Sequence, residues 1–247
     1  MFFVYKSVKV HYLEYINSSL LPPVVFLHGW GGDIRSFDYF ARALSCFRSC
    51  IVLSFPPFGR SQEPTSPWGV QDYTDLVVAL LDSLGYKECD IVAHSFGGRV
   101  ALQMCCDKKV HINKLLLTSS AGIGKKSIGK KIKIVHYKII KFLSKIHLYS
   151  KNKLEKMGSE EYKNLSPVMK KTFVNIVNYD QTPLLKHINA QTLLFWGKRD
   201  KDTPFYFTKI FKKNINNCEV IETNGTHFAY IEFSDLFLRV MISFLKE

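Results

Sequence analysis

Long apolar runs are absent from this 247-residue sequence. No stretch approaches the roughly 20 consecutive apolar residues that a membrane-spanning helix needs. The opening residues Met1-Phe2-Phe3-Val4-Tyr5-Lys6 are far too short an apolar stretch for a signal peptide. Internal repeats and low-complexity tracts are also missing, and 47% hydrophobic against 22% charged residues excludes a disordered chain. These features together predict a globular protein that stays in the cytoplasm.

The six cysteines lack the spacing of a metal or redox site. No Cys-x-x-Cys pair occurs, and no adjoining histidine stands at zinc-ligand spacing. A reduced thiol among apolar residues behaves as a small hydrophobic side chain, so we expect a structural role for all six. The sequence therefore predicts no metal site.

Acidic residues are scarce in one segment. Residues 122–190 contain 15 lysines against four acids, so this segment holds +11 of the net charge of +13. The rest of the chain is close to neutral. Because one segment accounts for nearly all of the basicity, the charge of the whole protein does not indicate nucleic-acid binding.

Short apolar segments alternate with helical patterns along most of the chain. The continuous apolar runs at 24–27 and 50–53 are typical of strands buried in a parallel sheet. The predicted strands are 2–5, 8–16, 24–27, 50–53, 90–93, 114–117, 192–196 and 219–221. The predicted helices are 34–44, 70–84, 96–106, 205–211 and 233–245. This alternation predicts an α/β fold, a mostly parallel eight-stranded sheet with helices on both faces.

The segment Ile91-Val92-Ala93-His94-Ser95-Phe96-Gly97-Gly98 places a serine between a buried strand and a helix. Small residues two positions before and two after Ser95 allow a sharp, strained turn. Such a turn lifts the serine hydroxyl above the sheet and points the Phe96 N–H toward the same place. The alternative interpretation is a glycine-rich turn in which the serine has no catalytic role. The pattern favours Ser95 as a nucleophile.

At this motif the sequence resembles the α/β-hydrolase family, and the resemblance runs nearly end to end. The family's usual Gly-x-Ser-x-Gly has alanine at its first position here. The segment His28-Gly29-Trp30-Gly31 matches the family's His-Gly oxyanion motif. The resemblance implies that the backbone N–H groups of Trp30 and Phe96 stabilise the developing oxyanion.

A further loop, Phe55-Pro56-Pro57-Phe58-Gly59-Arg60-Ser61, resembles the family's Asp-x-Pro-Gly-x-Gly-x-Ser loop. It differs from that pattern at two positions. Ser54 stands where the family usually has aspartate, and Pro57 stands where it has glycine. We therefore expect local hydrogen bonding in this loop to differ from the family pattern.

The family's acid and base follow the serine in the order Asp, His. The segment Trp196-Gly197-Lys198-Arg199-Asp200 matches the family's Trp-Gly-x-x-Asp and implies that Asp200 orients the base. Asp202 is the alternative, and it also fits a helix N-cap before Thr203-Pro204. His227, in Asn224-Gly225-Thr226-His227-Phe228, is the only histidine after the Asp200 strand and is the predicted base.

These groups imply a serine hydrolase that cleaves a carboxylic ester or related acyl bond of a small organic molecule through an acyl-enzyme, with no cofactor. Two alternatives are a hydrolase of a carbon–carbon bond in a vinylogous diketone and a non-catalytic ligand-binding module on the same fold. Ser95 argues against dehalogenase and epoxide-hydrolase chemistry, for which relatives use aspartate. Arg99 could reach a substrate carboxylate or could pair structurally beneath the site.

Residues 122–185 fall where the family inserts its cap, after the sixth strand, and we predict a helical cap there on a core formed by 1–121 and 186–247. Apolar residues at helical spacing form a stripe along 128–146, with lysines mainly on the opposite side. The simplest interpretation is a cap helix with a solvated lysine face. Peripheral contact with an anionic membrane, or selection of anionic substrates, is the alternative.

Overall fold

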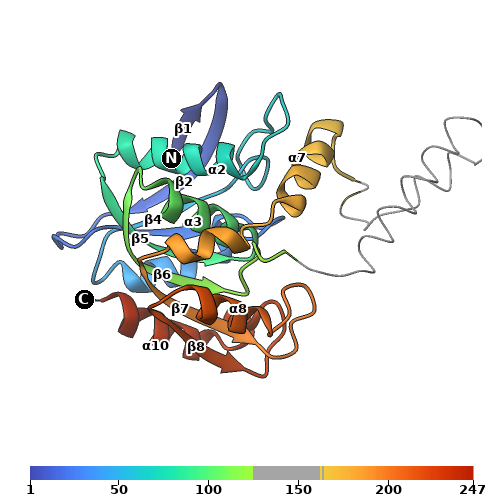
Figure 1. Cartoon of the computed structure of the whole chain (residues 1–247). Coiled ribbons are helices and arrows are strands. Elements are labelled where there is room, and N and C mark those ends of the chain that lie inside the picture. The colour runs from blue at the N-terminus through green and yellow to red at the C-terminus, as the bar shows by residue number, and fades with distance from the viewer. Residues whose placement is uncertain (125–161, 163, 247) are drawn as a thin grey trace, which may run out of the picture.

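The computed structural model describes residues 1–124, 162 and 164–246, and its centre is one eight-stranded sheet (Figure 1). The strands lie in the order β1-β2-β4-β3-β5-β6-β7-β8. The pairings of β2 with β1 and with β4 are antiparallel, and the others are parallel. The strands are β1 (Phe2–Tyr5), β2 (Val8–Tyr15), β3 (Val24–Leu27), β4 (Cys50–Leu53), β5 (Glu88–His94), β6 (His111–Thr118), β7 (Gln191–Gly197) and β8 (Cys218–Thr223). The predicted α/β fold with a mostly parallel eight-stranded sheet is confirmed.

Helices cover both faces of the sheet because successive residues of a strand point to opposite sides. In β3, Val25 and Leu27 belong to one buried cluster, with residues of α2, α3 and α8, whereas Val24 and Phe26 belong to the other, with residues of α1 and α10. The helices are α1 (Asp38–Leu44), α2 (Val70–Ser83), α3 (Phe96–Asp107), α7 (Pro167–Asn178), α8 (Phe207–Asn214), α9 (Ala229–Glu232) and α10 (Ser234–Leu245), with 3-10 turns η1 (Ile34–Ser36) and η2 (Thr182–His187).

The helix predicted over 34–44 is divided into η1 and α1 at Phe37. The Asp33 side chain accepts a hydrogen bond from the Arg35 N–H, which closes a short turn before the helix. Phe37 then leaves the helical conformation with φ of −130°, and its ring packs against Tyr230 with 5.1 Å between centroids. The sequence pattern does not reveal this break, because Phe37 is apolar in an otherwise helical pattern.

The carboxyl ends of the parallel strands lie at one edge of the sheet, where ligand sites of open α/β sheets form. The loops that leave this edge contain the predicted site residues. Trp30 follows β3, Ser95 follows β5, Asp200 follows β7 and His227 follows β8. The topology thus brings together Ser95 and His227, which are 132 positions apart in the sequence.

The segment predicted to form a cap, 122–185, is described only in part. Within it, α7 lies beyond the carboxyl ends of the strands (Figure 1), and the Thr172 hydroxyl accepts a hydrogen bond from the Trp68 N–H at 2.9 Å. The amphipathic stripe predicted for 128–146 lies outside the described residues, and the division into core and cap stays a prediction. Across the parts of the chain that the structure describes, no helix has both the length and the apolar character needed to cross a membrane.

Candidate active site

Ser95 stands at the sharp turn between β5 and α3. Its backbone is in the left-handed region, with φ of +48°, which is uncommon for a residue that carries a side chain. The residues on both sides of it are buried, whereas Ser95 itself is partly exposed. The turn therefore holds the hydroxyl out at the edge of the sheet.

Close backbone packing requires the glycines around Ser95. A Cβ atom on Gly97 would stand 2.1 Å from the carbonyl oxygen of Leu27, at the end of β3. A Cβ atom on Gly29 would stand 3.3 Å from the Cβ atom of Ser95. Because neither position has room for a side chain, the loop after β3 and the first turn of α3 lie in direct contact beside Ser95.

A second close approach brings Asp200 and His227 together. Gly197 ends β7, and a Cβ atom there would stand 2.2 Å from the carbonyl oxygen of Gly225. The same carbonyl accepts a hydrogen bond from the Arg199 N–H at 2.9 Å. The loop after β8 is therefore held directly against the loop after β7, and each of these two loops contributes one predicted catalytic residue.

Ser95, His227 and Asp200 form a continuous hydrogen-bonded series. The Oγ atom of Ser95 lies 3.0 Å from Nε2 of His227, and Nδ1 of His227 lies 3.0 Å from Oδ2 of Asp200. Because an ionised carboxylate only accepts, the imidazole proton lies on Nδ1 and Nε2 is left to accept from the serine hydroxyl. In this tautomer the imidazole can remove the serine proton, as a general base must.

The Asp200 carboxylate is buried and surrounded by donors. Oδ1 accepts from the N–H groups of Asp202 and Thr203, each at 2.9 Å, and Oδ2 lies 2.8 Å from the Thr203 hydroxyl. Burial alone would raise the pKa of Asp200, but the hydrogen bonds from His227 and Thr203 outweigh burial and hold the pKa below its ordinary value. Asp200 is therefore ionised at neutral pH and can stabilise a protonated His227.

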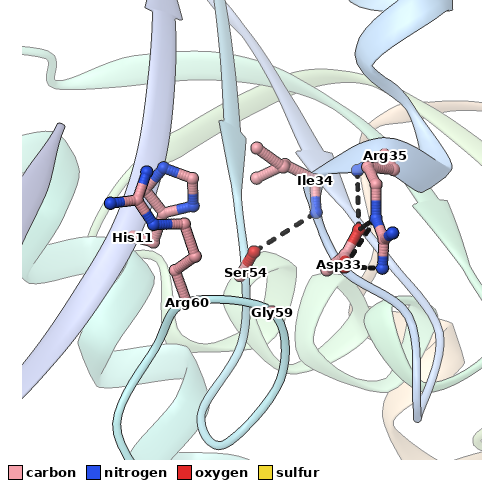
Figure 2. Close-up of a pocket in the computed structure, with 7 residues that line it drawn as sticks. All are labelled: His11, Asp33, Ile34, Arg35, Ser54, Gly59 and Arg60. Carbon is pink, nitrogen blue, oxygen red and sulfur yellow. Dashed lines mark hydrogen bonds and ion pairs between the residues drawn. The ribbon is translucent and has the colours of Figure 1, made fainter.

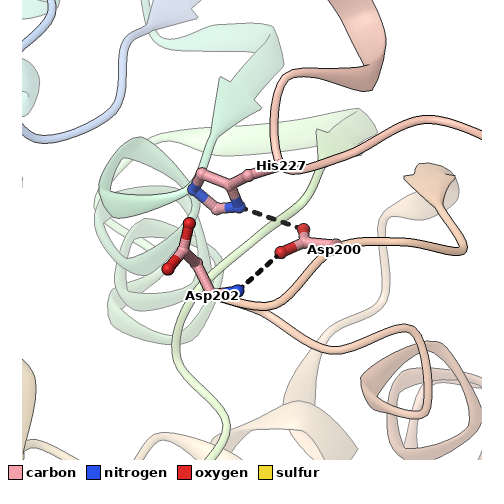
Figure 3. A group of neighbouring side chains, drawn as sticks. All are labelled: Asp200, Asp202 and His227. Atoms are coloured by element: carbon pink, nitrogen blue, oxygen red, sulfur yellow. Dashed lines mark hydrogen bonds and ion pairs between the residues drawn. The ribbon is translucent and has the colours of Figure 1, made fainter.

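Asp202, the alternative orienting acid, lies beside the same histidine (Figure 3). One ligand atom from each of Asp200, Asp202 and His227 lies within 4.8 Å of the others, a spacing that a metal ion could bridge. A metal ion ligated by Asp200 and by Nδ1 of His227 would have to displace the hydrogen bond between them. The turn after β7 is capped by Asp200, whose Oδ1 accepts the backbone N–H groups of Asp202 and Thr203. The arrangement thus fits an orienting carboxylate better than a metal site.

The backbone amides of Trp30 and Phe96 are the predicted oxyanion donors. Phe96 is the first residue of α3, and N–H groups in the first turn of a helix have no acceptor within the helix. Trp30 follows Gly29, which packs against Ser95. Both amides therefore belong to segments that lie against the serine.

His28 and His94 are buried beside the site and make fixed hydrogen bonds. Nδ1 of His28 donates to the Gly29 carbonyl at 2.7 Å, and Nε2 accepts from the Phe55 N–H at 2.8 Å. Nδ1 of His94 lies 3.1 Å from the Thr118 carbonyl. Burial lowers the pKa of His28 to about 4 and the pKa of His94 to about 3. Both rings are neutral near pH 7 and hold the loops around Ser95 in place.

We expect these two rings to make the fold acid-sensitive between pH 6.5 and about 4. In the unfolded chain each histidine binds a proton near its ordinary pKa of 6.5, whereas in the folded chain both stay neutral until about pH 4 and about pH 3. Their contribution to stability is therefore complete above pH 6.5 and is lost as the pH falls. With two extra protons taken up on unfolding, the free energy of unfolding should fall by up to about 2.7 kcal/mol per pH unit.

Chemical denaturation across this pH range measures the effect. His94→Asn keeps a donor for the Thr118 carbonyl but does not titrate, so it should reduce the slope by about half. His111→Asn, at an exposed histidine, is the matched control and should leave the slope unchanged. Equal slopes in the wild type and in His94→Asn would contradict the assignment.

Aromatic rings from three other segments pack around Trp30. Its ring lies 5.0 Å from Phe58, 5.5 Å from Phe96 and 5.2 Å from Phe173 of α7, measured between centroids. Since Trp30 and Phe96 both flank Ser95, the cluster gives the site one apolar side. Such a lining suits the apolar part of a small substrate.

Arg99 has a structural environment. Its guanidinium is mostly buried and donates to the Tyr179 carbonyl at 2.5 Å, and its own carbonyl accepts from the Gln181 side chain at 2.8 Å. Burial lowers the pKa of Arg99 to about 10. These contacts join α3 to the chain after α7, which favours the structural interpretation over a contact with substrate.

Thr203 and Glu232 support the site although the sequence assigned no role to either. The Thr203 hydroxyl lies 3.3 Å from Nδ1 of His227 as well as beside Asp200. The Glu232 carboxylate accepts from the Thr226 N–H at 2.8 Å and so fixes the loop that holds His227. The spacing Asp-x-x-Thr is a signal for a capped turn that could have indicated Thr203.

Comparison with known proteins gives one family match. A family model described as the alpha/beta hydrolase fold matches residues 22–136. The matched range contains the predicted oxyanion motif at residues 28–31, Ser95 and the strands β3 to β6. It ends before the loops that contain Asp200 and His227.

Relatives that match over nearly the whole chain are hydrolases and esterases by name. The chain is 26% identical to the uncharacterized hydrolase YugF of Bacillus subtilis, over 99% of this chain and 97% of that protein. It is 23% identical to the 2-hydroxy-6-oxo-6-phenylhexa-2,4-dienoate hydrolase of Comamonas testosteroni, over 91% and 87%. It is 24% identical to a pimeloyl-[acyl-carrier protein] methyl ester esterase of Legionella pneumophila, over 91% and 95%.

Solved structures of the same architecture superimpose on the chain. A hydrolase from Pseudomonas aeruginosa PA01 matches with a TM-score of 0.78 at 17% identity, covering 99% of this chain and 97% of that one. At this identity the likeness is one of fold.

Proposed function

The chain belongs to the α/β-hydrolase fold family and is a hydrolase, and we propose that it is a serine hydrolase cleaving a carboxylic ester or related acyl bond of a small organic substrate. The main support is the hydrogen-bonded series from Ser95 through His227 to Asp200, with 3.0 Å at each step. The serine is at a strained turn, the histidine has the tautomer of a base, and the aspartate is ionised. Each of the three groups therefore has the state that nucleophilic catalysis needs.

In the proposed acylation step, Nε2 of His227 removes the Ser95 proton while Oγ attacks the substrate carbonyl carbon. The carbonyl oxygen becomes an oxyanion, which accepts hydrogen bonds from the amides of Trp30 and Phe96. Each such donor lowers the barrier by about 3 kcal/mol. The protonated His227, stabilised by Asp200, then gives its proton to the alkoxide leaving group, and the alcohol departs.

In deacylation, a water molecule takes the place of the departed alcohol. His227 removes a proton from this water as its oxygen attacks the acyl carbon, and the same amides stabilise the second oxyanion. The bond to Ser95 breaks, and His227 returns the proton to the serine oxygen. The carboxylic acid leaves and the starting protonation states are restored, so the scheme needs neither a metal nor an organic cofactor.

The acyl group is proposed to lie against the aromatic cluster of Trp30, Phe58, Phe96 and Phe173. This cluster is apolar and adjoins the oxyanion amides, so an acyl chain can pack there while its carbonyl faces Ser95. One relative is named for a methyl ester, which agrees with ester chemistry on this fold. Contact of the lysine-rich segment 122–190 with an anionic membrane or an anionic substrate stays a prediction, since most of those lysines lie outside the described residues.

Hydrolysis of a carbon–carbon bond in a vinylogous diketone is the second candidate. It is favoured by the relative named for a 2-hydroxy-6-oxo dienoate. Ser95, His227 and Asp200 could also catalyse this reaction. The leaving group would then be a carbon atom, which must receive the proton from His227. A non-catalytic binding module is less consistent with the site, because a binding pocket needs no hydrogen-bonded Ser-His-Asp series. The cytoplasm is the proposed compartment, since all six cysteines are unpaired thiols.

A substrate panel tests this proposal. Purified protein is assayed with p-nitrophenyl esters of increasing acyl length and with a vinylogous diketone. We expect ester cleavage, with kcat/KM rising with acyl length as the chain reaches the aromatic cluster, and a lower kcat/KM on the diketone. Cleavage of the diketone without cleavage of any ester would favour the carbon–carbon alternative, and inertness toward both would favour a binding module.

A further inference from the structure

A pocket of about 300 Å³ is lined by residues other than the proposed catalytic groups (Figure 2). None of the residues lining it belongs to the Ser-His-Asp series or supplies an oxyanion amide. They come from β2, from the segment around η1 and from the loop after β4, and they are His11, Asp33, Ile34, Arg35, Ser54, Gly59 and Arg60. We call this the β4-loop pocket.

His11 lines the β4-loop pocket, and its side chain has an unpaired polar atom. The residue is only 5% exposed, and its Nδ1 is buried without a hydrogen-bond partner among the described residues. Burial lowers the pKa of His11, and the Met1 ammonium and the Arg60 guanidinium lower it further, while Asp33 acts in the opposite direction. Burying a polar nitrogen without a hydrogen-bond partner destabilises the folded protein. A ligand that forms a hydrogen bond with Nδ1 of His11 would remove this unfavourable contribution.

The charges that line the pocket are unbalanced. The Asp33 carboxylate already forms an ion pair with Arg35, whose Nη2 lies 2.6 Å from Oδ2 of Asp33. Arg60 lies beside His11 in Figure 2, and its guanidinium is 5.2 Å from the Phe2 ring. Among the residues that the structure describes, no carboxylate is within ion-pair distance of Arg60. The pocket therefore keeps one uncompensated guanidinium.

Ser54 adds a hydroxyl to the same space. Its Oγ accepts from the Ile34 N–H at 3.2 Å, which leaves the hydroxyl proton free to donate. Gly59, with φ of +60°, approaches so closely that a Cβ atom on it would stand 2.7 Å from Ser54 Oγ. The loop after β4 thus packs tightly around Ser54, which stands where the corresponding loop of the α/β-hydrolase family usually has an aspartate. A carboxylate at position 54 would supply the negative charge that Arg60 lacks.

We propose that the β4-loop pocket binds a small oxyanion, a carboxylate or phosphate group, held by the Arg60 guanidinium, the Ser54 hydroxyl and the His11 imidazole. The planar donor fork of arginine matches both groups. The bound oxyanion occupies the place that a side-chain carboxylate at position 54 would fill. Ser54 accepts a hydrogen bond from the N–H of Ile34, four residues after Trp30. The bound anion therefore also stabilises the segment that positions Trp30. The binding itself does not rest on the proposed hydrolase activity.

Thermal unfolding with added anions tests the proposal. Wild-type protein is heated in sodium phosphate, in sodium acetate and in sodium chloride at equal ionic strength. At tenfold the dissociation constant, bound oxyanion should raise Tm by about 3–6 °C above the value in chloride. The arm with the larger shift identifies whether phosphate or carboxylate is the preferred group. Equal Tm values in all three salts would overturn the proposal.

Three variants distinguish phosphate binding in the β4-loop pocket from a general effect of the protein's positive charge. Arg60→Gln should lose at least about tenfold in phosphate affinity. Arg239→Gln, which removes the same charge from an exposed position on α10, is the matched control and should keep the wild-type affinity. Ser54→Asp supplies the carboxylate covalently and should abolish the response to phosphate.

Equal losses in Arg60→Gln and Arg239→Gln would contradict the assignment, as would a full phosphate response in Ser54→Asp. If Ser54→Asp does not fold, the comparison of the two arginine variants decides, because both change exposed side chains. Ester hydrolysis is not the readout, so failure of this inference and failure of the proposed function can be told apart.

Discussion

Replacing Ser95 with alanine is expected to lower kcat for ester hydrolysis by roughly 10⁶-fold while the protein stays folded. The variant removes the hydroxyl oxygen that lies 3.0 Å from Nε2 of His227. No acyl-enzyme can then form, and the remaining rate comes from substrate binding and the oxyanion amides. Stability should change little, because Ser95 is partly exposed and alanine fills almost the same space.

Steady-state kinetics with a short-chain ester, together with thermal unfolding, measure both parts of this prediction. Ser83→Ala on α2 is a matched control, since its hydroxyl donates to the Leu80 carbonyl at 2.7 Å and does not belong to the Ser-His-Asp series. That control should keep wild-type kcat. Full activity in Ser95→Ala would remove the serine from the mechanism.

Replacing Asp200 with asparagine is expected to lower kcat by roughly 10⁴-fold. The asparagine oxygen can still accept the backbone N–H groups of Asp202 and Thr203, so the turn should survive. Its amide nitrogen would then face Nδ1 of His227 as a donor. The imidazole proton would move to Nε2, and the ring could no longer accept from Ser95.

Asp202→Asn is the matched control for this change, because it makes the same chemical substitution two residues away. We expect it to cost little in kcat, since the Asp200 carboxylate lies 3.0 Å from Nδ1 of His227 and accepts its hydrogen bond. Steady-state kinetics of both variants on one ester decide the matter. If Asp202→Asn caused the large loss and Asp200→Asn the small one, the orienting role would belong to Asp202.

The buried strands were predictable because a strand covered on both faces is a continuous apolar run. Their ends were harder to place, since polar residues such as Glu88 and His94 extend β5 through pairing with the neighbouring β6. The helix break at Phe37 depends on packing against Tyr230, a residue almost two hundred positions away. No local pattern contains that information.

The grouping of Ser95, Asp200 and His227 was predictable because short motifs fix each residue at the carboxyl end of a strand. Those ends meet at one edge once the sheet is parallel. The support of Asp200 by Thr203 and the β4-loop pocket were not predictable in this way. Both depend on contacts between side chains. In the pocket these side chains come from three separate segments, which lie close together only in the folded chain.

Covalent labelling with a fluorophosphonate, followed by peptide mass mapping, tests whether Ser95 is an activated nucleophile. The reagent reacts with a serine only when a neighbouring base activates it and oxyanion donors stabilise the product. We expect a single adduct on Ser95, no adduct in Ser95→Ala and slow labelling in Asp200→Asn. A wild-type protein that takes up no label, or an adduct on another residue that persists in Ser95→Ala, would contradict this expectation.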